Sequence, residues 1–257
     1  MTGDSSNQEE STFRFRRRTP GSFLIVPSSR DGRSVRCQGQ LEARAAMVLT
    51  ACPLVRRLTE QPLKIWYQYD PAMETGSVQL IASPIAGAKR QQGSLKVTYT
   101  IPDFLVELCD GNRFLIEVKP RRRLSRPRVQ RHAEAAQIYC QHNGLTWRIL
   151  TDDDLACEPL MTNLRKLVRY QSMVADEDSC AAMLELISDG MNVTDVLSRS
   201  SGNASGDWHI LLHLIATGRI TYDILHHELK LDTVLYRDEP ALWNPFESVW
   251  ARQVHSS

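Results

Sequence analysis

The sequence VTYTIPDFLVELCDGNRFLIEVKP, residues 97–120, contains the pattern that decides the fold. Apolar residues alternate with threonines at its start, and the apolar runs FLVEL and FLIEV flank the segment Asp110–Asn112. Two such runs on either side of an Asp-Gly-Asn segment are typical of a β-hairpin. We therefore predict two strands joined by a tight turn, the first of which begins at Val97.

Acidic residues interrupt these apolar runs in a defined order. Pro102-Asp103 lies in the first half of the hairpin, Glu117-Val118-Lys119 lies at its end, and thirteen residues separate Asp103 from Glu117. This is the P-D…(D/E)-x-K pattern of metal-dependent phosphodiesterases, in which carboxylates hold a hard cation and a lysine orients or activates the attacking water. An ordinary acidic strand pair is the alternative. However, an ionised carboxylate among apolar neighbours is normally paired or bound to metal.

The length of the hairpin loop decides whether these side chains can meet. Glu117 and Lys119 are two residues apart on a strand and share one face of the sheet. A two-residue turn would put Asp103 on the opposite face, whereas a three-residue loop from Asp110 to Asn112, or one bulge, brings all three together. We predict the odd-numbered loop.

Composition separates the two parts of the chain. The 257 residues are enough for one large domain or two small ones. Residues 1–150 contain 23 Lys and Arg against 13 Asp and Glu, and residues 151–257 contain 8 against 17. The basic half suggests contact with nucleic acid, and the acidic half suggests another kind of partner. No apolar run is long enough for a membrane span and no signal peptide is recognisable, so we expect a cytoplasmic protein with reduced cysteines.

Other elements surround the hairpin. We expect a first helix around GQLEARAAMVLTAC, starting near Arg36 and stopped by Pro53, with Glu42 at the border of its apolar stripe. A break at residues 59–62 is followed by a strand over 63–69, a second strand near 77–81 and a flexible connection over 83–94. After the hairpin, we expect a helix capped by Ser125 and closed by Gly144, and then a strand over 145–150.

Clusters of basic residues lie before the hairpin and directly after it. For the arm over residues 13–18, a solvated tail and phosphate contact are both open interpretations. A solvated helix start would explain the arginines that follow Lys119 but not their position directly after the acidic motif. We predict that they contact DNA phosphates, to which arginine forks bind well. The predicted DNA-binding residues are Arg16, Arg17, Arg18, Lys89, Arg90, Arg121, Arg122, Arg123, Arg126 and Arg128.

Residues 30–155 resemble TnsA, the restriction-endonuclease-like subunit of heteromeric transposases, including CRISPR-associated ones. The segments that carry the resemblance are GQLE, LTEQPLKI, YTIPDFLVEL-CDGNRFLIEVKP and GLTWRILTDDDL, in this order. The resemblance implies that Glu42, Asp103 and Glu117 bind Mg²⁺ (or Mn²⁺) and that Lys119 completes the catalytic set. Glu60 is the nearest rival of Glu42, although its place before a proline break suits a structural role.

The resemblance also implies an activity, which is cutting of the 5′ ends of the transposon. The partners that it implies are a TnsB-like DDE transposase and a TnsC-like AAA+ ATPase. Two alternatives remain open at the level of sequence: a stand-alone restriction or repair nuclease of the same fold, and a non-catalytic DNA-binding adaptor.

The sequence of the C-terminal part predicts three short helices and a hairpin formed by residues 220–224 and 233–236, as in a winged helix. Its third helix presents Asp207, His209 and His213 instead of arginines, so we expect it to contact protein, in the family the ATPase TnsC. His209 and His213 could ligate a metal, but packing is the favoured interpretation.

Together these observations predict an α/β fold, with a restriction-endonuclease-like domain whose central mixed sheet is flanked by helices and a small winged-helix-like α+β domain after it. The expected boundaries are a disordered tail over 1–13, the nuclease domain over 14–153, a connecting helix over 154–171, the second domain over 172–245 and a tail over 246–257.

Overall fold

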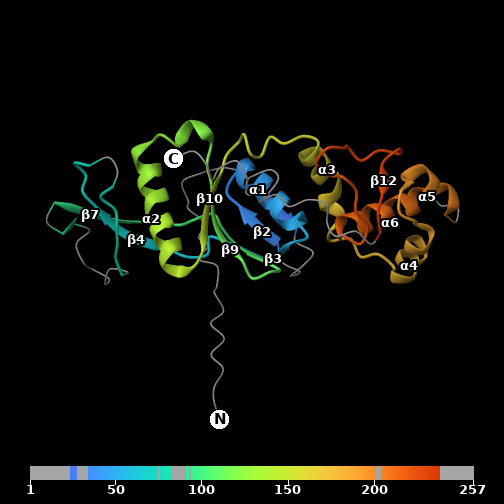
Figure 1. Ribbon diagram of the computed structural model, residues 1–257, viewed down its shortest axis with the longest axis horizontal. Helices are drawn as coiled ribbons and strands as arrows, with labels where there is room; N and C mark the ends of the chain where they lie inside the picture. Colours follow the sequence, from blue (N-terminus) through green and yellow to red (C-terminus); the bar gives the residue numbers. More distant parts are fainter. Residues whose placement is uncertain are drawn as a thin grey trace, which may run out of the picture.

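The computed structural model describes residues 24–27, 34–73, 76–82, 91–92, 94–200 and 204–237. The molecule is elongated: a small antiparallel sheet lies at one end, a central sheet lies in the middle, and a helical part forms the other end (Figure 1). The predicted tails, residues 1–13 and 246–257, lie outside the described residues, and so does most of the predicted connection over 83–94.

The central sheet is mixed and has the strand order β10-β9-β8-β3. Strands β3, β8 and β9 are antiparallel neighbours, whereas β10 runs parallel to β9. Parallel neighbours need a crossover connection, and α2 supplies it between β9 and β10. The bounds are β3 Val55–Glu60, β8 Phe104–Leu108, β9 Arg113–Val118, α2 Pro127–Asn143 and β10 Thr146–Leu150.

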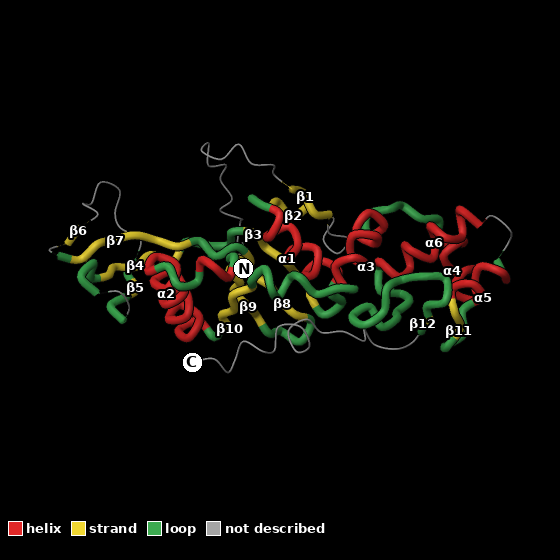
Figure 2. The backbone as a smooth tube through the Cα atoms, turned by 90° about the horizontal axis from the view of Figure 1, so that it is seen from above, coloured by secondary structure: helices red, strands yellow, loops and turns green. Residues whose placement is uncertain are grey.

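The first half of the predicted hairpin is two strands, not one. β7 (Leu95–Thr100) belongs to a second, antiparallel sheet of order β5-β4-β7-β6, and β8 belongs to the central sheet. The chain changes sheets at Ile101-Pro102-Asp103, because proline has no N–H for a ladder and restricts the residue before it. The other strands of this sheet are β4 Ile65–Tyr69, β5 Gln79–Leu80 and β6 Gln91–Gln92, and Figure 2 shows the sheet beside α2.

Helices cover both faces of the central sheet, as the alternation of side chains requires. Phe104, Val106 and Ile116 share one buried cluster with the helix α1 (Gln40–Ala51), and Leu105 and Leu115 share another with α2. α2 ends at Gly144, which adopts a left-handed conformation (φ 62°), as predicted. The mixed sheet with helices confirms the predicted fold class of the first part of the chain.

Several predicted boundaries are wrong. The segment Ser34–Cys37 forms the strand β2, paired with β1 (Leu24–Pro27), so the first helix starts only at Gln40. The predicted break at 59–62 begins later, because β3 continues to Glu60 and the turn falls at Gln61, whose φ is +45°. Ser125 does not cap α2: a 3-10 helix (Arg121–Arg123) precedes it, and Arg126 occupies the cap position without a side-chain hydrogen bond.

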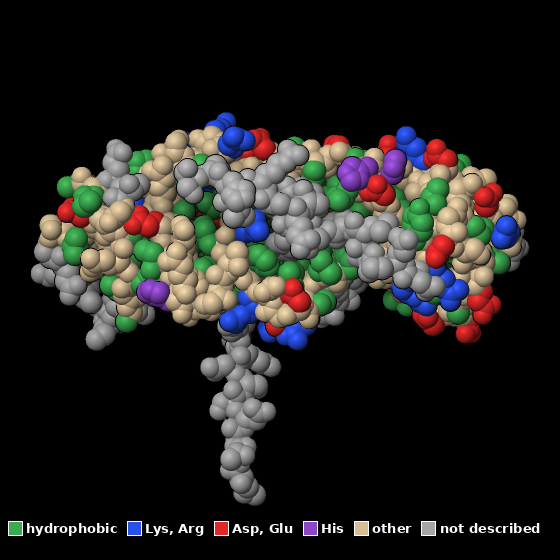
Figure 3. All heavy atoms as spheres, viewed as in Figure 1, with side chains coloured by type: hydrophobic (Ala, Val, Ile, Leu, Met, Phe, Trp, Pro, Cys, Tyr) green, Lys and Arg blue, Asp and Glu red, His purple; other side chains and the backbone are tan. Residues whose placement is uncertain are grey.

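The C-terminal part contains the three predicted helices and two very short strands. Its strands pair with each other, and only one isolated bridge, Thr221 with Tyr236, forms where a hairpin was predicted. The winged-helix assignment therefore stays a prediction. Figure 3 shows many acidic side chains at the end of the molecule that carries α4 and α5. The bounds are α3 Leu160–Leu167, a 3-10 helix Val168–Tyr170, α4 Glu177–Leu186, β11 Met191–Asn192, α5 Val193–Arg199, α6 Ala204–Ala216 and β12 Val234–Leu235.

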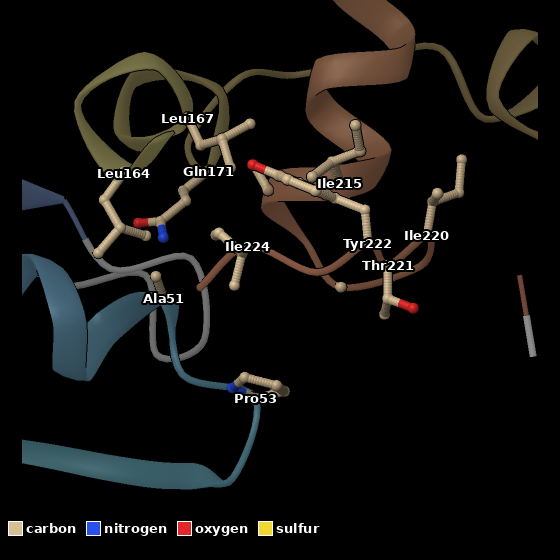
Figure 4. Close-up of a pocket in the computed structure, with 12 residues that line it drawn as sticks. Ala51, Pro53, Leu164, Leu167, Gln171, Ile215, Ile220, Thr221, Tyr222 and Ile224 are labelled. Carbon is tan, nitrogen blue, oxygen red and sulfur yellow. The ribbon is translucent and has the colours of Figure 1, made fainter. Parts of the chain in front are cut away.

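A cavity of about 450 Å³, including its open mouth, lies where the end of α1 meets α3 and α6 (Figure 4). The described residues of its lining are apolar apart from Gln171, Thr221 and Tyr222, and none of them is charged. Asp103, Glu117 and Lys119 are not among the described residues that line this cavity, and they meet instead at the central sheet. None of the described helices is long and apolar enough to cross a membrane.

Asn163 connects α3 to the segment that follows α6. Its side chain is fully buried, donates to the carbonyl oxygens of Ile224 (3.0 Å) and His227 (2.8 Å), and accepts from the N–H of Leu229 (2.8 Å). The bonds to Ile224 and Leu229 are buried, and a buried backbone group that loses its partner costs free energy.

The change Asn163→Leu should therefore lower the free energy of unfolding by about 2 kcal/mol or more, because it keeps the branched shape of the side chain but leaves buried polar groups unpaired. Urea unfolding followed by circular dichroism measures this loss. The control Asn143→Leu, at an exposed position in the last turn of α2, should change the same quantity by less than about 0.5 kcal/mol. Equal losses in the two variants would contradict this account of Asn163.

Candidate active site

The hairpin register brings the acidic motif together. Phe104 pairs with Ile116 and Leu105 pairs with Leu115, so one further step places Asp103 opposite Glu117. The hydrogen bond from the N–H of Leu108 to the carbonyl of Asn112 (2.8 Å) closes a three-residue loop, Cys109 to Gly111. The predicted odd loop is confirmed, although it begins one residue earlier than expected. Gly111 has a φ of +88°, a conformation that suits glycine.

Lys119 lies between the two carboxylates. Its Nζ forms an ion pair with Oε1 of Glu117 and another, at 3.6 Å, with Oδ2 of Asp103. The same Asp103 oxygen accepts a hydrogen bond from the N–H of Val118 (2.7 Å). Burial alone would lower the pKa of Lys119, but Asp103, Glu117 and Glu42 raise it above its ordinary value. Lys119 therefore stays a cation over the whole physiological range.

Glu117 is the most constrained acid of the site. It is only 6% exposed, and its Oε2 is buried without a hydrogen-bond partner among the described residues. Burial and the neighbouring Asp103 raise its pKa to about 8 despite the opposing effect of Lys119. Burial also raises the pKa of Asp103. An unpaired buried carboxylate oxygen is costly in a protein interior and is common at functional sites.

Glu42 reaches this site from another element. It lies in the first turn of α1, where its Oε2 accepts a hydrogen bond from the N–H of Gln38 (2.7 Å). Burial and the charge of Asp103 raise its pKa to about 7, and Lys119 opposes this shift. Glu42 is therefore within the electrostatic reach of the hairpin residues.

Glu60, the rival of Glu42, is buried at the end of β3 and pairs with Arg36 (3.3 Å). Its carboxylate raises the pKa of the Cys37 thiol, as Glu42 and Asp103 do, although burial contributes most. All three acids thus lie around one buried cysteine. The ion pair with Arg36 favours a structural role for Glu60, in agreement with its sequence context.

The described residues contain no ready-made group of three or more His, Cys, Asp or Glu side chains that could hold a metal ion. The hairpin nevertheless offers donors of the right chemistry, because Mg²⁺ prefers carboxylate oxygens and Oε2 of Glu117 has no other partner. Asp103, Glu117 and Glu42 therefore have the donor chemistry that a hard divalent cation prefers, although the described side chains are not gathered as a metal site.

The structure describes some of the predicted DNA-binding residues, and the others lie outside the described residues. Arg121 is exposed, but its guanidinium pairs with Asp153 and its backbone N–H donates a hydrogen bond to Oδ1 of Asp152 (2.6 Å). The side chains of Arg122, Arg123, Arg126 and Arg128 are exposed after the end of β9. Arg16, Arg17, Arg18, Lys89 and Arg90 lie outside the described residues. The structure therefore retains a basic rim after Lys119, in which Arg121 is already paired.

The sequence prediction missed His132, in the second turn of α2. Its Nδ1 lies 3.2 Å from Oγ1 of Thr100, and burial together with Arg128, Lys119 and Arg131 lowers its pKa to about 4. Lys119 of the acidic site is thus one of the charges that act on this imidazole. A lone histidine in an arginine-rich helix carries no motif, so the sequence offered no specific signal for it.

The histidines of the C-terminal part have local partners. His213 contacts the carbonyl of Tyr170 through Nδ1 (2.9 Å), and the ring of His209 lies 5.8 Å from that of Tyr170. His226 pairs with Asp223 (2.9 Å). The packing interpretation of His209 and His213 agrees with these contacts.

A P-D…E-x-K motif on antiparallel strands of a mixed sheet, covered by helices, is consistent with the class of restriction-endonuclease-like proteins. Within this class, residues 52–152 match the model of the family described as TnsA-like endonuclease N terminal. This match supports a TnsA-type endonuclease. It includes Asp103, Glu117 and Lys119, but Glu42 lies outside it. No curated protein matches the chain.

The raised carboxyl pKa values have a consequence for stability. The pKa values of Glu42 (about 7) and Glu117 (about 8) lie above the ordinary value of 4.5, so the folded protein keeps protons that the unfolded chain releases. Stability must then fall as the pH rises through this range. The lowered pKa of His132 acts in the opposite direction only below its ordinary value of 6.5.

We therefore expect the free energy of unfolding, measured with urea in EDTA, to fall between pH 6.5 and 8. The variant Glu117→Gln should reduce this fall by roughly 1–2 kcal/mol, because it removes the largest shift. Glu107→Gln, on the neighbouring strand β8, should keep the wild-type slope. An unchanged slope in Glu117→Gln would show that Glu117 does not titrate in this range.

Proposed function

We propose that the protein is a metal-dependent DNA endonuclease subunit of a heteromeric transposase and cuts the 5′ ends of the transposon. The observation that carries this proposal is the convergence of Asp103, Glu117 and Lys119 within the stretch that matches the TnsA-like family. The expected partners are a TnsB-like transposase and a TnsC-like ATPase, the latter at the acidic C-terminal part.

Asp103, Glu117 and Glu42 would hold the cation, for which we propose Mg²⁺, with Mn²⁺ as a substitute. When bound there, such an ion supplies a Lewis acid that polarises the phosphate and lowers the pKa of coordinated water. The unpaired Oε2 of Glu117 supports this assignment, because coordination would give a buried oxygen the partner it otherwise lacks.

Lys119 contributes charge and hydrogen bonds. Because its pKa is raised, its ammonium group does not act as a base at neutral pH. It donates hydrogen bonds, which can orient an attacking water, and its charge offsets the negative charge that develops on the phosphate. Its ion pairs with both acids hold it at this place before DNA arrives.

The hydrolysis test uses the full assembly with DNA that carries the transposon ends. Lys119→Ala should lower the rate of 5′-end cutting by about 100-fold or more, and Asp103→Ala should lower it further. The matched control is Asp110→Ala, which removes an acid from the loop of the same hairpin and should cut at the wild-type rate. Unchanged cutting by Asp103→Ala would indicate a non-catalytic adaptor.

A test of partner dependence distinguishes the proposed function from the remaining alternative, a stand-alone nuclease. We expect the purified protein alone to leave DNA uncut and to cut once the TnsB-like and TnsC-like proteins are added. Cutting by the isolated protein would instead favour a stand-alone nuclease of the same fold.

Metal dependence can be measured without cleavage. We expect calorimetric titration of the metal-free protein with Mg²⁺ to give saturable binding, which Glu117→Gln should weaken at least tenfold because it removes an anionic ligand. Glu107→Gln is the control, and equal affinity in the two variants would remove Glu117 from the binding site.

A further inference from the structure

A chain of hydrogen bonds connects the second sheet to the rim of the site. Thr100 is the last residue of β7, and its Oγ1 lies 3.2 Å from Nδ1 of His132. Nε of Arg128 donates to Nε2 of the same imidazole at 3.4 Å. The ring also packs edge-on against Tyr67, with centroids 6.2 Å apart. His132 is therefore held from three sides.

These contacts fix the protonation state of the imidazole. Because Nε2 accepts from a guanidinium, the ring proton must be on Nδ1, from which it is donated to Thr100. A lowered pKa keeps the ring neutral at physiological pH. His132 is thus neither a cation for phosphate nor a general base, because the lone pair of Nε2 is already engaged by Arg128.

This arrangement orients the guanidinium of Arg128 so that it can bind an anion. Arg128 is the second residue of α2, where the helix dipole is positive, and its side chain is exposed. With Nε engaged by His132, its two terminal nitrogens remain for a bidentate contact, the geometry by which arginine binds phosphate. Lys119 is one of the charges that lower the pKa of His132, so the imidazole lies within the electrostatic influence of this lysine.

We propose that His132 is a positioning residue that holds Arg128, on the basic rim that follows β9, against a DNA backbone phosphate. This inference rests on the proposed function, since it names the part of the site that positions the DNA. Thr100 fixes the imidazole, the imidazole fixes the guanidinium, and the guanidinium contacts the phosphate. His132 itself touches neither DNA nor the reacting atoms.

The experiment measures binding of a 30-base-pair duplex by the full chain in EDTA at several salt concentrations, by fluorescence anisotropy. Arg128→Gln should reduce the slope of log K against log salt by about 0.9, the value for one lost phosphate contact. His132→Phe, which keeps a ring against Tyr67 but has no acceptor, should reduce the slope by a similar amount. The double variant should lose little more than either single one.

Two further variants separate positioning from packing. His132→Gln can place an acceptor near the position of Nε2 and should restore most of the wild-type slope. His132→Asn can replace Nδ1 alone and should not restore it. The control Arg165→Gln, on the exposed surface of α3, should leave the slope unchanged.

The outcomes distinguish this inference from the function on which it rests. Failure of the wild-type protein to bind the duplex would overturn this inference, whereas the proposed function is decided separately by 5′-end cutting in the full assembly. If the wild type binds but Arg128→Gln or His132→Phe keeps the full slope, only the inference is overturned. Additive losses in the double variant, or equal behaviour of His132→Gln and His132→Asn, would overturn it as well.

Discussion

The balance of charge around Lys119 is the interaction on which the site depends. Two carboxylates and one ammonium group are brought together where β8 begins and β9 ends, and Glu117 is almost fully buried. Burying such groups costs free energy that their mutual attraction repays only in good geometry. The surrounding fold supplies this geometry through the hairpin register and through two helices that exclude water from both faces. The cost remains visible in the raised pKa values of Glu42 and Glu117.

Much of the central fold could be predicted from the sequence, because its signals are local. Apolar runs around an Asp-Gly-Asn segment specified the hairpin, and the requirement that Asp103 share a face with Glu117 and Lys119 specified an odd loop. The division of the first strand at Pro102 was missed, since alternation continues on both sides of the proline and does not reveal which sheet each half joins. β3 was missed for a related reason: Gln61-Pro62 marked a turn, but the strand before it contains two arginines and lacks a clear alternation.

The residues of the site differ in the same way: some carry a local sequence signal and others do not. Asp103, Glu117 and Lys119 could be brought together from sequence because one hairpin carries all three. Glu42 required a resemblance, since it lies on a helix whose position relative to the hairpin is set by packing. His132 could not be anticipated, because its contact with Thr100 joins residues 32 positions apart and forms only when α2 crosses back over the sheets. Residues that act through a neighbouring side chain carry no pattern of their own.

The way Asp103 is held has a consequence for how this site can change over evolution. Its carbonyl oxygen accepts from the backbone N–H of Gln61 (2.8 Å) and its carboxylate accepts from that of Val118 (2.7 Å). Both donors are peptide groups, which every residue except proline supplies. Neighbouring side chains can therefore drift without displacing the acid. Homologous proteins can then keep the architecture of such a site although only a few short sequence motifs remain similar between them.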